Sequence, residues 1–327
     1  MGEINRLAIK KQIRLKPVPS SRSEKKIDRL THVLCEALRY TANEPTLFAQ
    51  SEEFLSPKLA KLEIDRPLGN RINKVIEQIG GVPRLIMYRT GDALPRYDTY
   101  GGAAIREILD SFQRCRRSVC RTHVCFIGAE FGRTNQDILQ DLPKKVKKEL
   151  IEIMAEVFWE HAETSYVRLA SYWDRVGQFL DYIFFNIRQY ERDGFPAVMD
   201  RISSNYVRLF PGLDTSTFWL ELRRYQNSQK PTGFQWLLRR RNLLVHSLHL
   251  GAIRGTKAKE NPIFTSAYNH LEESVHKKLQ PESPESELGY LHEHLSIATR
   301  LFSPVIELCE HCAALTRKDI ARDFASP

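Results

Sequence analysis

The sequence lacks the long apolar runs and the short catalytic signatures that identify many protein classes. No apolar stretch approaches the roughly 20 residues that a membrane-spanning helix needs. The first residues, MGEINRLAIKKQIRLKP, carry charges throughout and lack the apolar core of a signal peptide. The patterns of P-loop ATPases, dinucleotide-binding folds, zinc proteases and α/β-hydrolases are absent as well. We therefore expect a cytoplasmic protein without membrane contact, outside those enzyme classes.

Cysteine is sparse, with six residues in a chain of 327. Without a secretory signal, we expect thiols in a reducing compartment rather than disulfides. The run Cys309–Cys312, with His292 and His294 upstream, is the one pattern that invites a zinc site. A structural zinc site usually needs a second ligand pair from a turn. We therefore expect buried thiols in a helix here, with no metal and no cofactor.

Strand signals are few, and helical periodicity dominates. The best strand candidates are short runs at 84–88 and 124–127, and neither has a hairpin partner. The apolar periodicity and the cap and breaker residues predict an all-α protein. The expected helices lie at about 23–38, 45–55, 67–80, 103–117, 144–188 (as one helix or two), 196–209, 214–227, 233–248 and 286–321, the last kinked at Pro304.

Two regions differ in character along the chain. Residues 1–135 are rich in loops, notably at 82–101, whereas residues 136–327 consist mainly of long helices. A wide apolar stripe between Leu169 and Phe184 is typical of a helix deep in a bundle. We expect an N-terminal, mostly helical region of unknown role and a C-terminal helical bundle.

The net charge of +9 suits an anionic partner, and nucleic acid is the usual one. Between Lys230 and Lys259 there are seven Lys and Arg residues and no acidic residue. This interval contains Arg241-Asn242-Leu243-Leu244-Val245-His246, the segment most informative about function. A cationic field around His246 favours the neutral imidazole and attracts phosphates.

These residue types suit the cleavage of RNA without a metal. Histidine can transfer protons near neutral pH, and arginine presents a planar fork of donors to phosphate oxygens. Asn242 and His246 are four residues apart and share a helix face, where the amide can hold the imidazole or the substrate. Arg241 and His246 are five apart, which places them about 140° apart around a helix. This spacing favours a site completed by a second subunit.

The segment resembles the R-x-x-x-x-H motif of HEPN domains (higher eukaryotes and prokaryotes nucleotide-binding), in which a polar residue often follows the arginine. The run from Tyr172 to Leu180, YWDRVGQFL, also resembles the first long helix of some prokaryotic members. The resemblance covers roughly residues 150–320. It implies a helical bundle that dimerises, and many members are metal-independent ribonucleases of toxin–antitoxin, phage-defence or RNA-processing systems. It further implies that Arg241 and His246 are the catalytic pair.

The same resemblance assigns supporting roles to two other polar residues. Asn242 matches the auxiliary polar position, and Asp174 is expected to support the site. Its carboxylate either pairs with Arg241 or another arginine or only faces the solvent. Arg239 and Arg240 are expected to bind the RNA backbone, with a solvated basic face as the alternative. His249, one turn beyond His246, is either a further site residue or a surface histidine.

A second basic patch could extend an RNA-binding surface, although a solvated face is again the alternative. Its members are Arg114, Arg116, Arg117 and Arg121. Three functions thus remain in view: an RNA endonuclease, a non-catalytic HEPN-like module that binds a nucleotide, RNA or a protein, and a helical scaffold with a chance motif.

Overall fold

The computed structural model describes two compact units, Met1–Gln50 and Ser51–Pro327, which we treat separately. The described residues are a few positions between 31 and 49, then 59–80, 100–134, 143–185, 194–207, 212–246, Leu250 and 282–325. In the first unit the described positions are helical. The expected helix at 45–55, except Ala49, and the loop predicted at 251–262 lie outside the described residues.

The second unit is an all-α bundle, as the sequence predicts, and no strand occurs in its described ranges. Its α-helices and one π-helical turn are α3 (Arg66–Gly80), α4 (Tyr100–Thr134), α5 (Lys144–Phe185), α6 (Phe195–Ile202), η2 (Ser203–Val207), α7 (Thr217–Asn227), α8 (Phe234–His246) and α13 (Pro284–Ala325). Among the described helices, none has the length and apolar character needed to cross a membrane.

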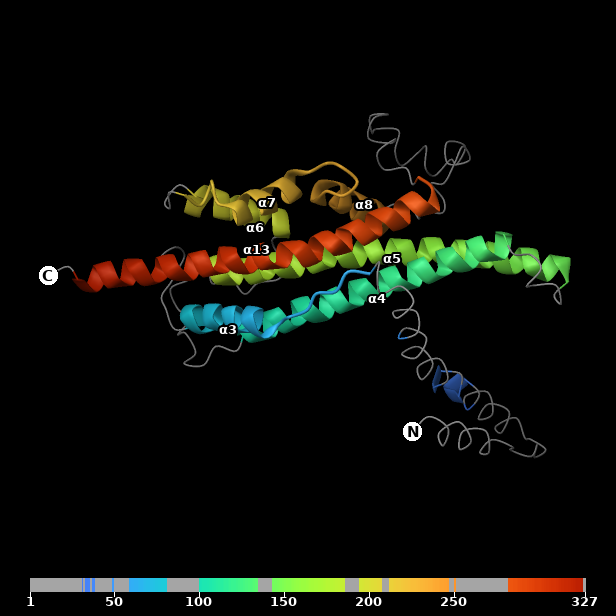
Figure 1. The fold of residues 1–327 in the computed structure, drawn as a ribbon, viewed down its shortest axis with the longest axis horizontal. Coiled ribbons are helices and arrows are strands. Elements are labelled where there is room, and N and C mark those ends of the chain that lie inside the picture. Colours follow the sequence, from blue (N-terminus) through green and yellow to red (C-terminus); the bar gives the residue numbers. More distant parts are fainter. Residues whose placement is uncertain are drawn as a thin grey trace. The chain divides into compact units, whose positions relative to one another are not determined.

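Helices α4 and α5 pack along each other as an antiparallel pair (Figure 1). Small residues allow a close approach: a Cβ at Gly128 would lie 3.0 Å from the Met154 sulfur, and one at Gly132 would lie 3.0 Å from Ile151. The expected segment 144–188 is a single helix as far as Phe185. The bundle thus rests on two long neighbouring helices.

The strand signal at 124–127 is wrong, because these residues lie inside α4. The helix expected at about 103–117 extends over 35 residues and includes them. Val124 is exposed and the next three residues are partly buried, so the run fits the sides of a helix. Packing against α5 overrides the β preference of this short run.

Helix α5 forms the centre of the bundle, and its apolar stripe is buried as predicted. It packs against α4, α6, α8 and α13, whereas α13 also packs against α3, α4 and α7. Pro304 lies within α13, which continues past it. The buried stripe comprises Leu169, Trp173, Val176, Phe179, Leu180, Ile183 and Phe184.

The boundary expected at 135/136 falls between α4 and α5, which pack together, whereas the two compact units divide at Gln50/Ser51. The helix expected at 196–209 is α6 followed by the π-helical turn η2. Gly177 lets α6 begin against the backbone of α5. A Cβ there would lie 2.8 Å from the backbone nitrogen and Cα of Phe195. Asp174 lies one turn before Gly177 on α5.

Candidate active site on helix α8

Three consecutive arginines on α8 have different surroundings. Arg239 and Asn242 are exposed, Arg241 is half-buried, and Arg240 is 1% exposed. Each step along a helix turns the side chain by about 100°, so neighbours in sequence face different environments. Position 240 follows Trp236 by four residues and precedes Leu243 by three, and all three side chains are buried. Arg240 therefore belongs to the inner face of α8.

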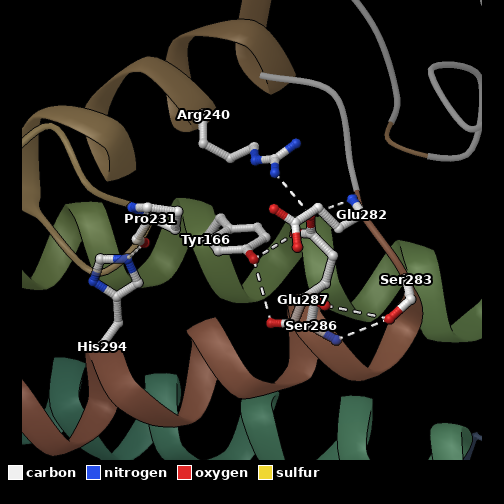
Figure 2. Close-up of polar contacts among 8 residues, drawn as sticks. All are labelled: Tyr166, Pro231, Arg240, Glu282, Ser283, Ser286, Glu287 and His294. Atoms are coloured by element: carbon white, nitrogen blue, oxygen red, sulfur yellow. Dashed lines mark hydrogen bonds and ion pairs between the residues drawn. The ribbon is translucent and has the colours of Figure 1, made fainter. Parts of the chain in front are cut away.

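Arg240 belongs to a buried polar network. Its side chain contacts other residues of the protein and is not on the surface, where an RNA backbone could reach it. Its Nη2 donates to Glu287 Oε1 at 2.8 Å, and Glu287, near the start of α13, is fully buried (Figure 2). Tyr166 of α5 donates its hydroxyl proton to Glu287 Oε2 at 2.6 Å, and the backbone N–H of Glu282 donates to Oε1 at 3.1 Å. The guanidinium also lies 4.5 Å from the centre of the Trp236 ring. Three helices are thus joined at one carboxylate.

His294 adds a second buried polar group beside this network. Its Nε2 lies 2.9 Å from the carbonyl oxygen of Pro231, so this nitrogen carries the proton and donates it (Figure 2). Its Nδ1 then accepts a hydrogen bond from the Tyr225 hydroxyl at 3.3 Å. Burial lowers the pKa of His294 to about 4. The imidazole is therefore neutral at physiological pH, and it stacks on Trp236.

Arg241 and Asn242 face away from this network, toward α5 and the solvent. Arg241 Nη1 donates to Asn242 Oδ1 at 3.0 Å. Burial raises the pKa of Asp174 on α5, and the positive charge of Arg241 opposes that shift. A backbone hydrogen bond from Phe195 opposes it as well. Of the sequence-predicted residues, Arg241 is thus close enough to Asp174 for its charge to act on that carboxyl group, and Arg241 bonds to its neighbour Asn242.

Gly194 closes the Asp174 side of this group. A Cβ at Gly194 would lie 2.8 Å from Asp174 Oδ1, so a side chain there would displace the carboxylate. Asp174 accepts a hydrogen bond from the backbone N–H of Phe195. Phe195 lies in the first turn of α6, where backbone N–H groups have no partner within the helix. Asp174 therefore anchors α6 as well as adjoining Arg241.

The two histidines that the sequence predicts for the site, His246 and His249, lie at and beyond the end of α8. His246 is the last residue of α8, one turn after Asn242, and only its backbone is described. His249 lies outside the described residues. Their side-chain roles remain predictions from the sequence. Arg241, Asn242 and His246 all lie in the last two turns of α8.

The cysteine and histidine residues of α13 that suggested a zinc site have different contact partners. Cys309 and Cys312 are buried, and Cys312 donates to the carbonyl oxygen of Ile183 at 3.8 Å. His292 contacts His123 of α4 at 3.0 Å between ring nitrogens. In the described ranges, no group of three or more His, Cys, Asp or Glu side chains could hold a metal ion.

Sequence reasoning missed Glu287 and Tyr166 as partners of Arg240. A signal for Glu287 exists, since it precedes the buried residues Leu291, His294 and Leu295 by four, seven and eight positions. A carboxylate on such an inward stripe needs a buried cation.

Comparisons with models of protein families, with curated proteins and with solved structures each find no match. The interpretation of the site therefore depends on its residues and their geometry.

Proposed function

We propose that this protein is a metal-independent RNA endonuclease whose active site forms around Arg241, Asn242 and His246. One observation carries the proposal: Arg241 lies near the partly buried carboxyl group of Asp174 and bonds to the exposed Asn242. The hydrogen bond to Asn242 uses one donor of Arg241 and leaves its other donors for a phosphate, whose oxygens a guanidinium can bind through two parallel hydrogen bonds. The HEPN-like sequence motif supplies the expectation that the phosphate belongs to RNA.

The reaction needs two proton transfers and stabilisation of negative charge. The ribose 2′-oxygen attacks the adjacent phosphorus while the bond from phosphorus to the 5′-oxygen breaks. A base takes the 2′-hydroxyl proton, and an acid protonates the 5′-oxygen, giving a 2′,3′-cyclic phosphate and a 5′-hydroxyl. His246 performs one of these transfers. Arg241 donates to the phosphoryl oxygens, and Asn242 orients the imidazole or the substrate.

One motif supplies one histidine, whereas the reaction has two transfers. The proposal therefore includes a homodimer in which a second copy of the motif faces the same cleft, as the HEPN resemblance implies. In that arrangement one His246 acts as base and the other as acid. An antitoxin or a defence-system protein is the expected regulatory partner.

The test is cleavage of a fluorescent RNA in EDTA by the purified protein and by Arg241→Ala and His246→Ala variants. We expect a loss of about 10²- to 10⁴-fold for His246→Ala, which removes a proton-transfer group, and of about 10²- to 10³-fold for Arg241→Ala, which removes donors to the phosphoryl oxygens. Arg224→Ala, on the exposed side of α7, is the control and should retain activity. Cleavage retained in both site variants, or cleavage that depends on added metal, would contradict the proposal.

A protein that binds RNA or a partner but never cuts RNA would favour the non-catalytic HEPN-like module instead. Circular dichroism of each variant shows whether the fold persists, so a loss of folding is not mistaken for a loss of chemistry.

A further inference from the structure

A stripe of arginines follows one side of α4, away from α8. Arg114 and Arg117 are exposed and Arg121 is half-buried. Their spacings of three and four residues place them within about 60° around the helix. Arg116, expected in the same patch, is 3% exposed and donates its Nε–H to the carbonyl oxygen of Ala60 at 3.1 Å. The surface stripe therefore consists of the other three.

Arg168 of α5 adds a fourth cation to this stripe. Its Nη1 donates to the backbone oxygen of Arg114 at 3.2 Å, which brings its guanidinium to the α4 side of α5. Burial lowers the pKa of Arg168, and the neighbouring charges of Arg121, Arg114 and Arg117 lower it further. We call Arg114, Arg117, Arg121 and Arg168 the α4–α5 arginine cluster.

The cluster has defined edges. His161 lies seven residues before Arg168 on the same side of α5; burial lowers its pKa, and Arg121 is the next largest cause. Glu160 opposes that shift. At the other end of the cluster, the exposed Asp110 lies one turn before Arg114 on α4, and Arg175 pairs with Glu107 at 3.4 Å. Between these edges four like charges share a small surface, where a polyanion would relieve their repulsion.

An accessible strip of α5 connects the cluster with the candidate active site. Arg168 and Asp174 are six residues apart, which corresponds to about 120° around the helix and about 9 Å along it. Thr164, Ser171 and Gln178 point from α5 into the sector between the directions of these two side chains. All three are at least partly exposed. The two groups therefore border one solvent-facing strip, with the cluster on the α4 side and Arg241 on the α8 side.

We propose that the α4–α5 arginine cluster binds the phosphates of single-stranded RNA, and that the bound strand crosses the exposed strip of α5 to reach Arg241. An unpaired strand can bend around one helix, and arginine offers its bases a planar surface as well as charge. This proposal rests on the proposed function for the identity of the strand as RNA. The cluster would hold substrate and take no part in bond cleavage.

The test is the salt dependence of binding to a fluorescent 20-nucleotide oligouridine, measured by anisotropy. For single strands, each neutralised phosphate contributes about 0.7 to the slope of log affinity against log salt concentration. The double variant R114Q/R117Q should therefore lose about 1.4 from the slope. If the salt plots converge at 1 M, its affinity at 0.1 M salt falls about 25-fold. Both residues are exposed, so the fold should persist.

The matched control is R224Q/R300Q, which removes two exposed arginines on α7 and α13 and thus the same charge. Its slope should stay close to that of the parent protein. An unchanged slope in R114Q/R117Q, or an equal change in both double variants, would overturn the proposal. So would displacement of the oligouridine by polyglutamate of the same charge as readily as by unlabelled RNA, or tighter binding of an RNA duplex.

Experiments can contradict the proposed RNA-binding cluster and the proposed nuclease independently of each other. R114Q/R117Q should raise the RNA concentration needed for half-maximal cleavage while leaving the rate at saturation unchanged, whereas His246→Ala should bind RNA with the parent slope and not cut it. A cluster-dependent slope in a protein without any cleavage would support the binding surface and reject the nuclease.

Discussion

The buried pair of Arg240 and Glu287 gives the sharpest test of how α8 is held. The perturbation is a double-mutant cycle with Arg240→Met and Glu287→Leu, which replace each charged side chain by an apolar one of similar length. Both side chains are at most 1% exposed, and their charged atoms are 2.8 Å apart. Solvent therefore screens neither charge once its partner is removed.

The magnitudes follow from what each single variant leaves behind. Removing one partner of a buried pair costs about 3–5 kcal/mol, because the other charge stays buried. In Arg240→Met, Glu287 keeps its hydrogen bonds from Tyr166 and from the backbone of Glu282, so we expect about 3 kcal/mol. In Glu287→Leu, the guanidinium keeps its ring contact with Trp236 but loses its carboxylate, and the Tyr166 hydroxyl loses its 2.6 Å acceptor. We expect about 5 kcal/mol there.

The double variant should lose far less than the sum of the two single variants. Apolar pairs often replace buried ion pairs without loss, and the remaining cost is the Tyr166 hydroxyl, about 1–3 kcal/mol. The assay is urea unfolding followed by circular dichroism, with equal m values required for the comparison. The coupling energy should thus be about 5–7 kcal/mol. Additive losses in the double variant would refute the reasoning, because they would show that neither charge depends on the other.

Two further predictions concern the surroundings of the site. Burial lowers the pKa of His294 from 6.5 to about 4, so the unfolded chain binds the extra proton between these values. Stability should therefore be complete above pH 6.5 and fall by about 3 kcal/mol as pH drops to 4. Urea unfolding at pH 7 and pH 5 checks this, and a pH dependence unchanged in His294→Gln would contradict it. Gly177→Ala should lower stability by about 1–3 kcal/mol, since its Cβ would lie 2.8 Å from the Phe195 backbone. Thermal unfolding measures that loss, and Gly102→Ala, with no atom within 4 Å, should cause none; equal effects in the two variants would reject the packing argument.

The helical class and the course of α5 follow from the sequence because both depend on apolar periodicity. The buried residues from Leu169 to Phe184 repeat at helical spacing, and packing preserves that pattern. The strand signal at 124–127 failed because a short apolar run does not distinguish a strand from the side of a helix. Its outcome depends on α5, a neighbour whose contacts with α4 no local pattern contains.

In the candidate site, too, the sequence predicts some features, whereas others depend on contacts with distant parts of the chain. The sequence offers an arginine as one of two possible surroundings for Asp174, and in the structure the charge of Arg241 acts on its carboxyl group. The sequence does not distinguish Arg240 from Arg239 and Arg241, because which of three consecutive arginines is buried depends on the face of α8 that packs against its neighbours. The spacing from Trp236 to Leu243 already includes position 240, but an arginine there is stable only with a buried acid. That acid, Glu287, is 47 residues further along the chain.

The proposed role of Arg241 in binding phosphate must be separated by experiment from the structural role of its neighbour Arg240 on α8. Arg240 and Arg241 point about 100° apart, so a rotation of α8 that moved Arg240 out of the core would also turn Arg241 away from Asp174. Loss of RNA cleavage in Arg240→Met alone would therefore not show that Arg240 touches substrate. The double variant Arg240→Met/Glu287→Leu resolves this, because it restores a packed inner face without the guanidinium. Activity in the double variant but not in the single one would assign Arg240 to positioning and leave Arg241 as the arginine that meets the phosphate.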